Sequence, residues 1–336
     1  MFQTLDIDIY GSTIRVQSAK AQSLEILKKE FLQFISPLST RPRFLLTLHP
    51  TAAPSAALPN LVASRISQNS LSYDEGPRRW NDYFGKALSC YDYEMQEGVV
   101  YSADEDLLHE IAYLMILSLT GKELDERGRH KIHACGFRYK GIDALVMLPS
   151  KGGKTTLFLE LSQLPGVSLI SDDTPLIDSQ GLVHPFALRL GVEKIPAHLT
   201  PQKESFALFR RQSFGDKWLI GLDRLGAPLA QGAGARPRLF IGLRHNSQAA
   251  SFVRATTLQT TRALLEHMIV GVGLPMVIEY FVRHSLRDWC NLTKIAVKRA
   301  SAALKLMGKG QTHLFLMGTD PKHNAHALLQ HLERNP

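Results

Sequence analysis

The chain has 336 residues, of which 44% are hydrophobic and 21% charged, a composition that excludes a disordered or fibrous protein and is typical of a globular one. The 39 Lys and Arg exceed the 31 Asp and Glu, and the formal net charge of +8 favours anionic partners such as nucleotides or phosphorylated metabolites. Three unclustered cysteines exclude a disulfide framework. Because the sequence contains neither a signal-peptide pattern nor an apolar run of about 18 residues, we expect a cytoplasmic protein without a transmembrane segment.

The first 50 residues combine strand and helix signals. Apolar and polar residues alternate over 5–9 and again over 13–16, which predicts two strands joined by a hairpin at 10–12. Apolar residues recur at helical spacing over 19–34, and 44–48 returns to strand character. The chain therefore begins with an α+β pattern.

The next segment continues that pattern. Residues 51–59 are rich in Ala and Pro and predict a loop, whereas 80–102 carry short, aromatic-rich strand signals. An acidic triplet then precedes an apolar helix expected over 107–119 and ended by Gly121.

Beyond residue 128 the pattern changes to strand, loop and helix. A compact apolar run at 144–148 is followed by a Gly-Lys-Thr cluster and a helical segment at 157–161, and a second apolar run at 167–170 ends in two aspartates. We therefore predict two domains, an N-terminal α+β domain at 1–127 and a second domain at 128–336. The fold class expected is α/β, α+β overall.

The loop after the first apolar run resembles a phosphate-binding loop. The segment 148–155 fits seven of the eight positions of G-x-x-x-x-G-K-[ST], whose glycines let backbone amides surround a phosphate chain. The departure is Leu148, which stands where the first glycine belongs. Lys154 would neutralise the β- and γ-phosphates of ATP and the Thr155 hydroxyl would hold Mg²⁺. The residues expected to contact the nucleotide are Ser150, Lys151, Gly152, Gly153, Lys154, Thr155 and Thr156.

Two adjacent carboxylates follow the second strand. Asp172 lies 17 residues after Thr155, and in a parallel βαβ unit this spacing brings Asp172 and Asp173 to the same sheet edge as the loop. One carboxylate could hold the metal there, and the other could face a hydroxyl nucleophile. A glycine-rich turn before a surface helix would explain the loop alone, but the strand, loop, helix and aspartates together favour nucleotide binding.

These motifs together resemble the HPr kinase-like family, which includes the HPr kinase/phosphorylases. The resemblance rests on a histidine, His133, shortly before the strand of the loop, on the loop itself, and on a strand ending in Asp-Asp; it is clear over 128–190 and weaker to 330. It implies a P-loop kinase domain with a mixed central sheet, related to the nucleotide domain of phosphoenolpyruvate carboxykinases. The resemblance does not extend to residues 1–125.

The resemblance also implies roles for single residues. It makes Asp172 the general base for the acceptor hydroxyl, Asp173 its metal-associated partner and His133 a histidine beside the active site. From the residues alone, a satisfied strand histidine is the better interpretation of His133. Arg189, which follows the aspartates within 17 residues, could stabilise the transferred phosphoryl group or be an exposed loop arginine.

The sequence thus predicts an ATP- and Mg²⁺-dependent kinase that phosphorylates a hydroxyl of a protein, a peptide or a small molecule. Leu148 motivates the alternative of a catalytically inactive nucleotide-binding regulator or scaffold. A basic amphipathic helix expected over 286–306 motivates nucleic-acid binding, but without aromatic interleaving a solvated face is the better interpretation. The N-terminal domain would recognise the acceptor or assemble subunits into a homo-oligomer.

Overall fold

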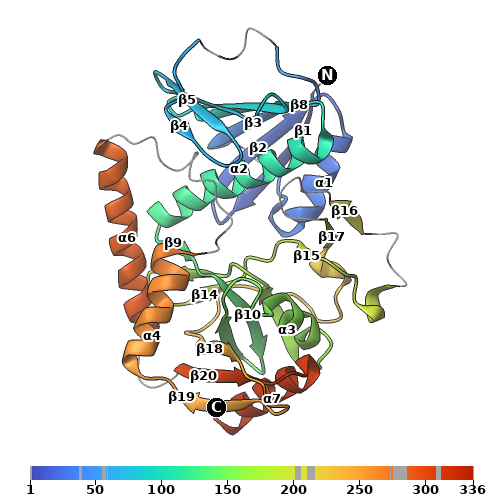
Figure 1. Ribbon diagram of the computed structural model, residues 1–336, viewed down its shortest axis with the longest axis vertical. Helices are drawn as coiled ribbons and strands as arrows, with labels where there is room; N and C mark the ends of the chain where they lie inside the picture. The colour runs from blue at the N-terminus through green and yellow to red at the C-terminus, as the bar shows by residue number, and fades with distance from the viewer. Residues whose placement is uncertain are drawn as a thin grey trace. The chain divides into compact units, whose positions relative to one another are not determined.

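The structure, a computed structural model, describes residues 2–37, 40–54, 58, 60–200, 206–209, 216–272, 274, 286–307 and 312–335. The chain divides into two compact units (Figure 1). The first comprises the described residues within Met1–Leu124, Glu193–Trp218 and Pro275–Asn291, and the second those within Asp125–Val192, Leu219–Leu274 and Leu292–Pro336. Short strands β15 (Leu190–Val192), β16 (Ala207–Phe209) and β17 (Lys217–Ile220) lie where the chain passes between the units.

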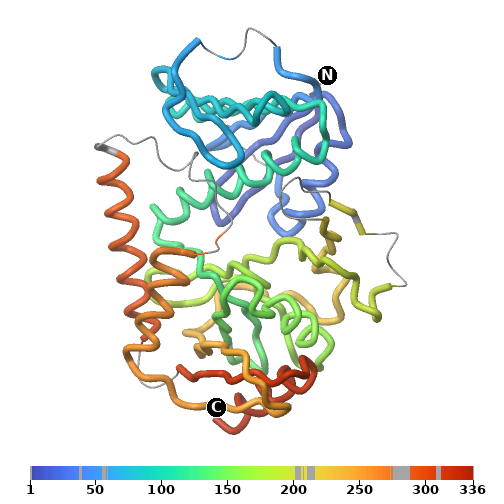
Figure 2. The backbone as a smooth tube through the Cα atoms, viewed as in Figure 1, coloured from blue at the N-terminus to red at the C-terminus, as the bar shows by residue number. Residues whose placement is uncertain are grey.

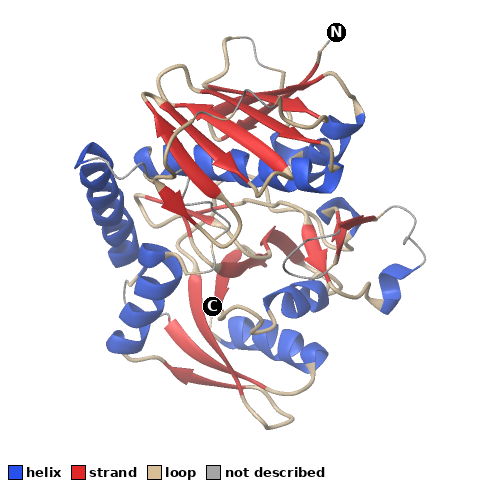
Figure 3. Cartoon of the chain, turned by 45° about the horizontal axis from the view of Figure 1, so that its top comes forward, coloured by secondary structure: helices blue, strands red, loops and turns tan. Residues whose placement is uncertain are grey.

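The first unit is built on an eight-stranded mixed sheet of order β1-β2-β3-β8-β7-β6-β5-β4 (Figure 3). Its central strands β2, β3 and β8 are parallel, and the remaining neighbours are antiparallel. The hairpin expected at 10–12 is confirmed, with Tyr10 and Gly11 both at positive φ. The strands are β1 (Gln3–Ile9), β2 (Ser12–Ser18), β3 (Phe44–His49), β4 (Arg65–Ile66), β5 (Leu71–Glu75), β6 (Arg78–Asp82), β7 (Ala87–Asp92) and β8 (Glu97–Ser102).

Helices α1 (Gln22–Glu30) and α2 (Glu105–Glu126) accompany this sheet, with a short 3₁₀ turn, η1 (Leu32–Phe34), between α1 and β3. Helix α2 runs along one face of the sheet (Figure 3) and buries apolar residues from Leu108 to Leu124. It approaches β8 so closely that a Cβ on Gly98 would lie 2.5 Å from Cε of Met115. Gly98 therefore permits the contact between helix and sheet.

The expected end of this helix at Gly121 is wrong, because α2 continues to Glu126. A glycine in a helix costs only about 1 kcal/mol relative to alanine, and burial of the apolar Leu124 outweighs that cost. The carboxylate of Asp125 accepts a hydrogen bond of 2.5 Å from Arg299. The helix ends instead before Gly128, whose φ of 79° is the left-handed conformation that terminates helices.

The second unit contains a six-stranded mixed sheet of order β12-β10-β11-β18-β20-β19, and a three-stranded sheet of order β14-β13-β9. Its strands are β9 (Arg129–Lys131), β10 (Ala134–Tyr139), β11 (Ile142–Met147), β12 (Val167–Ser171), β13 (Leu176–Asp178), β14 (Val183–His184), β18 (Arg238–Arg244), β19 (Ser251–Arg254) and β20 (Thr312–Met317). Its helical segments are α3 (Lys154–Leu161), the 3₁₀ turn η3 (Leu222–Arg224), α4 (Thr257–Leu264), the π-helical η4 (Leu265–Val270), α6 (Leu286–Leu306, which begins in the first unit) and α7 (Pro321–Arg334).

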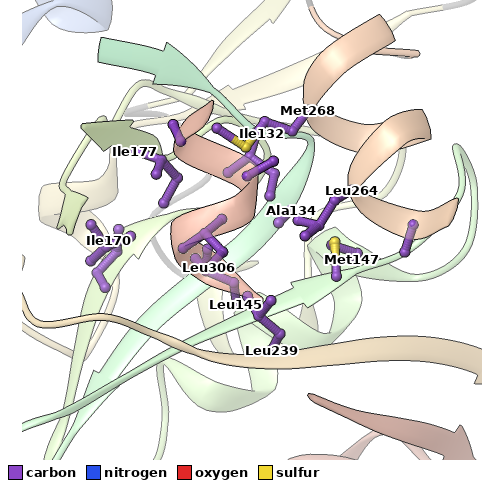
Figure 4. Packing of buried hydrophobic residues seen from close by; sticks show 14 of the residues in the cluster. Ile132, Ala134, Leu145, Met147, Ile170, Ile177, Leu239, Leu264, Met268 and Leu306 are labelled. Atoms are coloured by element: carbon purple, nitrogen blue, oxygen red, sulfur yellow. The ribbon is translucent and has the colours of Figure 1, made fainter. Parts of the chain in front are cut away.

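The six-stranded sheet has a helical layer on each face. On one face, Leu145 and Met147 of β11 pack in a buried cluster with residues of α4, η4 and α6, such as Leu264 and Leu306 (Figure 4). On the other face, α3 packs against α7, and His331 of α7 stacks on Phe252 at a ring distance of 4.2 Å. Figure 2 shows the C-terminal segments, coloured orange to red, in the same unit as the green strands. Consecutive residues of β11 therefore face different helical layers.

The α/β class with mixed sheets is confirmed, and so is the helix expected over 286–306. Strands β11 and β12 run in the same direction but are not neighbours, because β10 lies between them and is antiparallel to both. The simple parallel βαβ unit expected from the sequence is therefore replaced by a mixed sheet. The carboxyl ends of β11 and β12 still lie at one edge of it.

Candidate phosphate-binding and catalytic site

The backbone conformation of the loop between β11 and α3 depends on its two glycines. The Gly152 N–H donates to the carbonyl of Pro149 at 2.9 Å, and a Cβ on Gly152 would lie 2.8 Å from that same oxygen. Gly153 has a φ of 102°, and Lys151 a φ of 60°. Positive φ values cost a side-chain-bearing residue free energy, so the backbone geometry explains the Gly-Gly pair without reference to any ligand.

Helix α3 begins without a side-chain cap. Its N-cap residue is Gly153, which has no side chain that could accept from the first amides of the helix. The first turn contains no acidic residue and consists of Lys154, Thr155 and Thr156. Unsatisfied amides and the positive end of the helix dipole favour an anion at this position.

Lys154 is folded back over the loop. Its side chain is 8% exposed, and its Nζ donates to the carbonyls of Leu148 at 3.0 Å and Pro149 at 3.4 Å. The same nitrogen lies 3.7 Å from Oδ1 of Asp173. Burial lowers the pKa of Lys154, and the nearby Asp173 and Asp172 oppose that shift. The ammonium group is therefore held between the loop and the carboxylates.

The two aspartates meet the loop from the end of β12. The Thr155 hydroxyl donates to Oδ2 of Asp172 at 3.3 Å. Asp173 lies between Lys154 and His133, whose Nε2 is 3.1 Å from its Oδ1. Both carboxylates are half-buried. The sequence-predicted residues Lys154, Thr155, Asp172, Asp173 and His133 are thus brought into one group.

His133 lies between β9 and β10 and is 4% exposed. Its backbone N–H donates to the carbonyl of His267 at 2.8 Å, and the two imidazole rings are 5.6 Å apart. Burial, followed by the charge of His133, lowers the pKa of His267 to about 4. His267 was missed in the sequence, where a single histidine within an apolar helical segment gave no signal of chemistry.

The other predicted residues occupy different environments. Ser150 and Lys151 are exposed in the loop, and Thr156 is exposed in the first turn of α3. Arg189 is half-buried immediately before β15, and its role toward a phosphoryl group stays a prediction.

Arg244, at the end of β18, was not predicted but contacts the loop. Its Nε donates to the carbonyl of Gly152 and one terminal nitrogen to that of Lys151, both at 3.3 Å. An apolar strand signal ending in a basic residue at 238–244 could have pointed to it. The sequence alone did not indicate that this strand lies beside β11.

The polar groups near the loop fit a nucleotide-bound magnesium ion. Among the described residues, no group of three or more His, Cys, Asp or Glu could hold a metal by itself. Magnesium at a nucleotide needs only one or two protein ligands, since phosphate oxygens and waters supply the rest. The oxygens of Thr155 and Asp172, 3.3 Å apart, are close to the separation of about 3.0 Å expected for two adjacent octahedral ligands.

No protein-family model and no curated protein matches this chain. Within the described part of the chain, no helix is both long and apolar enough to cross a membrane.

Proposed function

We propose that the protein is an ATP-dependent phosphotransferase that phosphorylates a hydroxyl group. The observation that carries the proposal is the convergence of Lys154 and Thr155, at the start of α3, with Asp172 and Asp173, at the end of β12. A cation, a hydroxyl and two carboxylates around an open helix N-terminus are the groups that phosphoryl transfer requires. A structural glycine turn would not need the buried lysine or the paired aspartates.

Each residue has a defined task in this proposal. The amides at the start of α3 and the Lys154 ammonium would bind the β- and γ-phosphates and stabilise their charge. Bound Mg²⁺ would neutralise phosphate charge, with Thr155 among its ligands. One aspartate would accept the proton of the acceptor hydroxyl. The hydroxyl oxygen would bond to the γ-phosphorus while the bond between that phosphorus and the β–γ bridging oxygen breaks, which releases ADP.

Two assignments of the aspartates are compatible with that chemistry. The family resemblance makes Asp172 the general base and Asp173 the metal-associated residue. The contacts favour the opposite assignment, because Asp172 accepts from Thr155, the expected magnesium ligand, whereas Asp173 faces His133 and Lys154. A neighbouring imidazole would orient Asp173 toward the acceptor and could share its proton.

The acceptor would be a protein, a peptide or a small molecule, and the first unit would recognise it or assemble subunits. The sheet and helices around a phosphate loop are enough to hold a nucleotide, so the first unit is available for substrate selection. The alternative of an inactive nucleotide-binding regulator predicts ATP binding without transfer to any acceptor.

The decisive experiment measures Mg-ATP binding by calorimetry and then phosphate transfer from γ-labelled ATP to candidate acceptors. We expect binding by the wild-type protein and its loss in Lys154→Ala. Lys322→Ala is a matched control, because it removes the same charge from an exposed position in the first turn of α7, another helix of the same unit. Equal ATP affinity in the wild type and a folded Lys154→Ala variant would contradict nucleotide binding at this loop. Binding without transfer to any acceptor would favour the regulator.

A further inference from the structure

Strand β18 lies beside the strand that carries the loop. It is parallel to β11, and Met147 is paired with Ile241, so Gly242 and Arg244 continue alongside the loop that begins after Met147. Ile241 packs with Met147 in the buried cluster on the α6 side of the sheet. Because side chains alternate along a strand, Gly242 and Arg244 belong to the opposite face, where α3 begins.

Gly242 provides the space for Leu148, the residue that departs from the phosphate-loop pattern. Leu148 is 1% exposed, and a Cβ on Gly242 would lie 2.7 Å from its Cγ and closer still to one of its methyl carbons. The leucine side chain is therefore packed over the neighbouring strand. A glycine in β18 makes room for the side chain at the loop's first position.

Arg244 holds the loop from the same strand. Its guanidinium donates to two successive carbonyls, those of Lys151 and Gly152. A terminal nitrogen also lies 3.5 Å from the point that a Cβ on Gly153 would occupy, at the N-cap of α3. Among the described residues, no carboxylate forms an ion pair with Arg244. Its charge thus lies at the start of the helix.

These contacts fix the direction of a loop amide. In a trans peptide, the carbonyl of one residue and the N–H of the next point in opposite directions. The Gly152 carbonyl accepts from Arg244, so the Gly153 N–H must point away from the guanidinium. The guanidinium reaches the two carbonyls with two different nitrogens held in one plane, a geometry that the single nitrogen of a lysine ammonium at the same position does not reproduce.

We propose that Arg244 is a positioning residue of the phosphate loop: it orders the loop before nucleotide binds and adds its positive charge to the phosphate site. The second part rests on the proposed function, whereas the ordering of the loop does not. In this arrangement, β18 completes a phosphate loop whose first position is a leucine.

The experiment compares Arg244→Ala, Arg244→Lys and Arg254→Ala in the full-length chain. Arg254 is exposed on β19 and is paired with His313 rather than with the loop edge, so its replacement removes the same charge from the same sheet without touching the loop. Two quantities are measured: amide hydrogen exchange of loop residues 150–153 without nucleotide, and the Kd for Mg-ATP by calorimetry. Chemical denaturation establishes that each variant is folded.

We expect both Arg244 variants to exchange loop amides about tenfold faster than the wild type, because both lose the two-carbonyl contact. The Kd should rise about tenfold in Arg244→Ala and by less in Arg244→Lys, which retains the charge. Loop exchange equal to that of Arg254→Ala would overturn the positioning role. Faster loop exchange with an unchanged Kd in Arg244→Ala would overturn the contribution to phosphate binding. If the wild type binds no Mg-ATP, the proposed function fails, and the exchange comparison still decides whether Arg244 orders the loop.

Discussion

Each unit contains a connection in which a strand of a mixed sheet leads into a helix, and the two connections differ in how the helix begins. Between β8 and α2, the Asp104 carboxylate accepts from the amides of Asp106 at 3.0 Å and Leu107 at 3.2 Å. Between β11 and α3, the equivalent position is Gly153, and no side chain caps the helix. One helix satisfies its first amides with its own acid, whereas the other leaves them available for an external anion.

The surroundings of the two helix starts extend this contrast. The first turn of α2 carries Glu105 and Asp106, which would repel a phosphate. The first turn of α3 contains no acidic residue, and Lys154 and Arg244 lie beside it, together with the carboxylates of Asp172 and Asp173 at the end of β12. The two connections therefore differ in the charge of the first helical turn, and only the second has free helix amides beside cations that could bind a phosphate. The composition of the connection, and not the fold around it, locates the candidate site.

The largest effect should come from removing Lys154, the lysine at the uncapped start of α3. Lys154→Ala deletes the charge that would stabilise the transferring phosphoryl group, so we expect phosphate transfer to fall by at least about a hundredfold. Transfer is measured with γ-labelled ATP, and circular dichroism establishes that the variant is folded. Unchanged transfer in a folded Lys154→Ala protein would refute the kinase proposal.

The next largest effects should separate the two aspartates. Replacing the general base should leave Mg-ATP binding intact and remove most transfer, whereas replacing the metal ligand should raise the Mg²⁺ concentration needed for half-maximal activity by about tenfold or more. Asp172→Asn and Asp173→Asn are compared in a Mg²⁺ titration. If Asp173→Asn alone raises the magnesium requirement, the assignment from the family resemblance holds. If Asp172→Asn alone does, the contact with Thr155 gave the correct assignment.

Stability should depend on pH because of His267, which packs against His133 beside the loop. Burial lowers the pKa of His267 to about 4 from an ordinary value of 6.5, so the folded state favours the neutral imidazole. Below about pH 6.5 the unfolded chain binds a proton that the folded chain does not, and stability should decline until about pH 4, by up to about 3 kcal/mol. Denaturant unfolding between pH 7 and 4 measures this decline. A His267→Gln variant with the same decline would show that another group causes it.

Local patterns predicted much of the fold because they depend on residues close in sequence. The hairpin at Tyr10 and Gly11, the strand before the loop and helix α6 all follow from hydrophobic period and turn residues. The wrong helix end at Gly121 shows the limit, since burial of Leu124 outweighs the local cost of a glycine.

The candidate site, too, was predictable from the sequence only in part. A spacing rule placed Lys154, Thr155 and the aspartates at one sheet edge, although it did not foresee β10 between their strands. Arg244 reaches the loop from a strand about 90 residues later in the sequence, and His267 reaches His133 from a helix still further along; both contacts depend on strand order and helix packing. A single sequence contains no periodic signal for such pairings.

The smallest effect tests the comparison itself by changing the start of each helix. Asp104→Ala removes the cap of α2 and should lower the free energy of unfolding by about 1 kcal/mol without changing the Kd for Mg-ATP.

Gly153→Ala should lower the free energy of unfolding by about 1–2 kcal/mol, because alanine is disfavoured at a φ of 102°. It should also weaken ATP binding, because a backbone that moves away from this φ would shift the first amides of α3. Denaturant unfolding and calorimetry are run on both variants. If the two variants lose similar stability and only Gly153→Ala loses ATP affinity, the open helix start has a function beyond folding. Equal losses of affinity would mean that the two connections do not differ in the way the structure indicates.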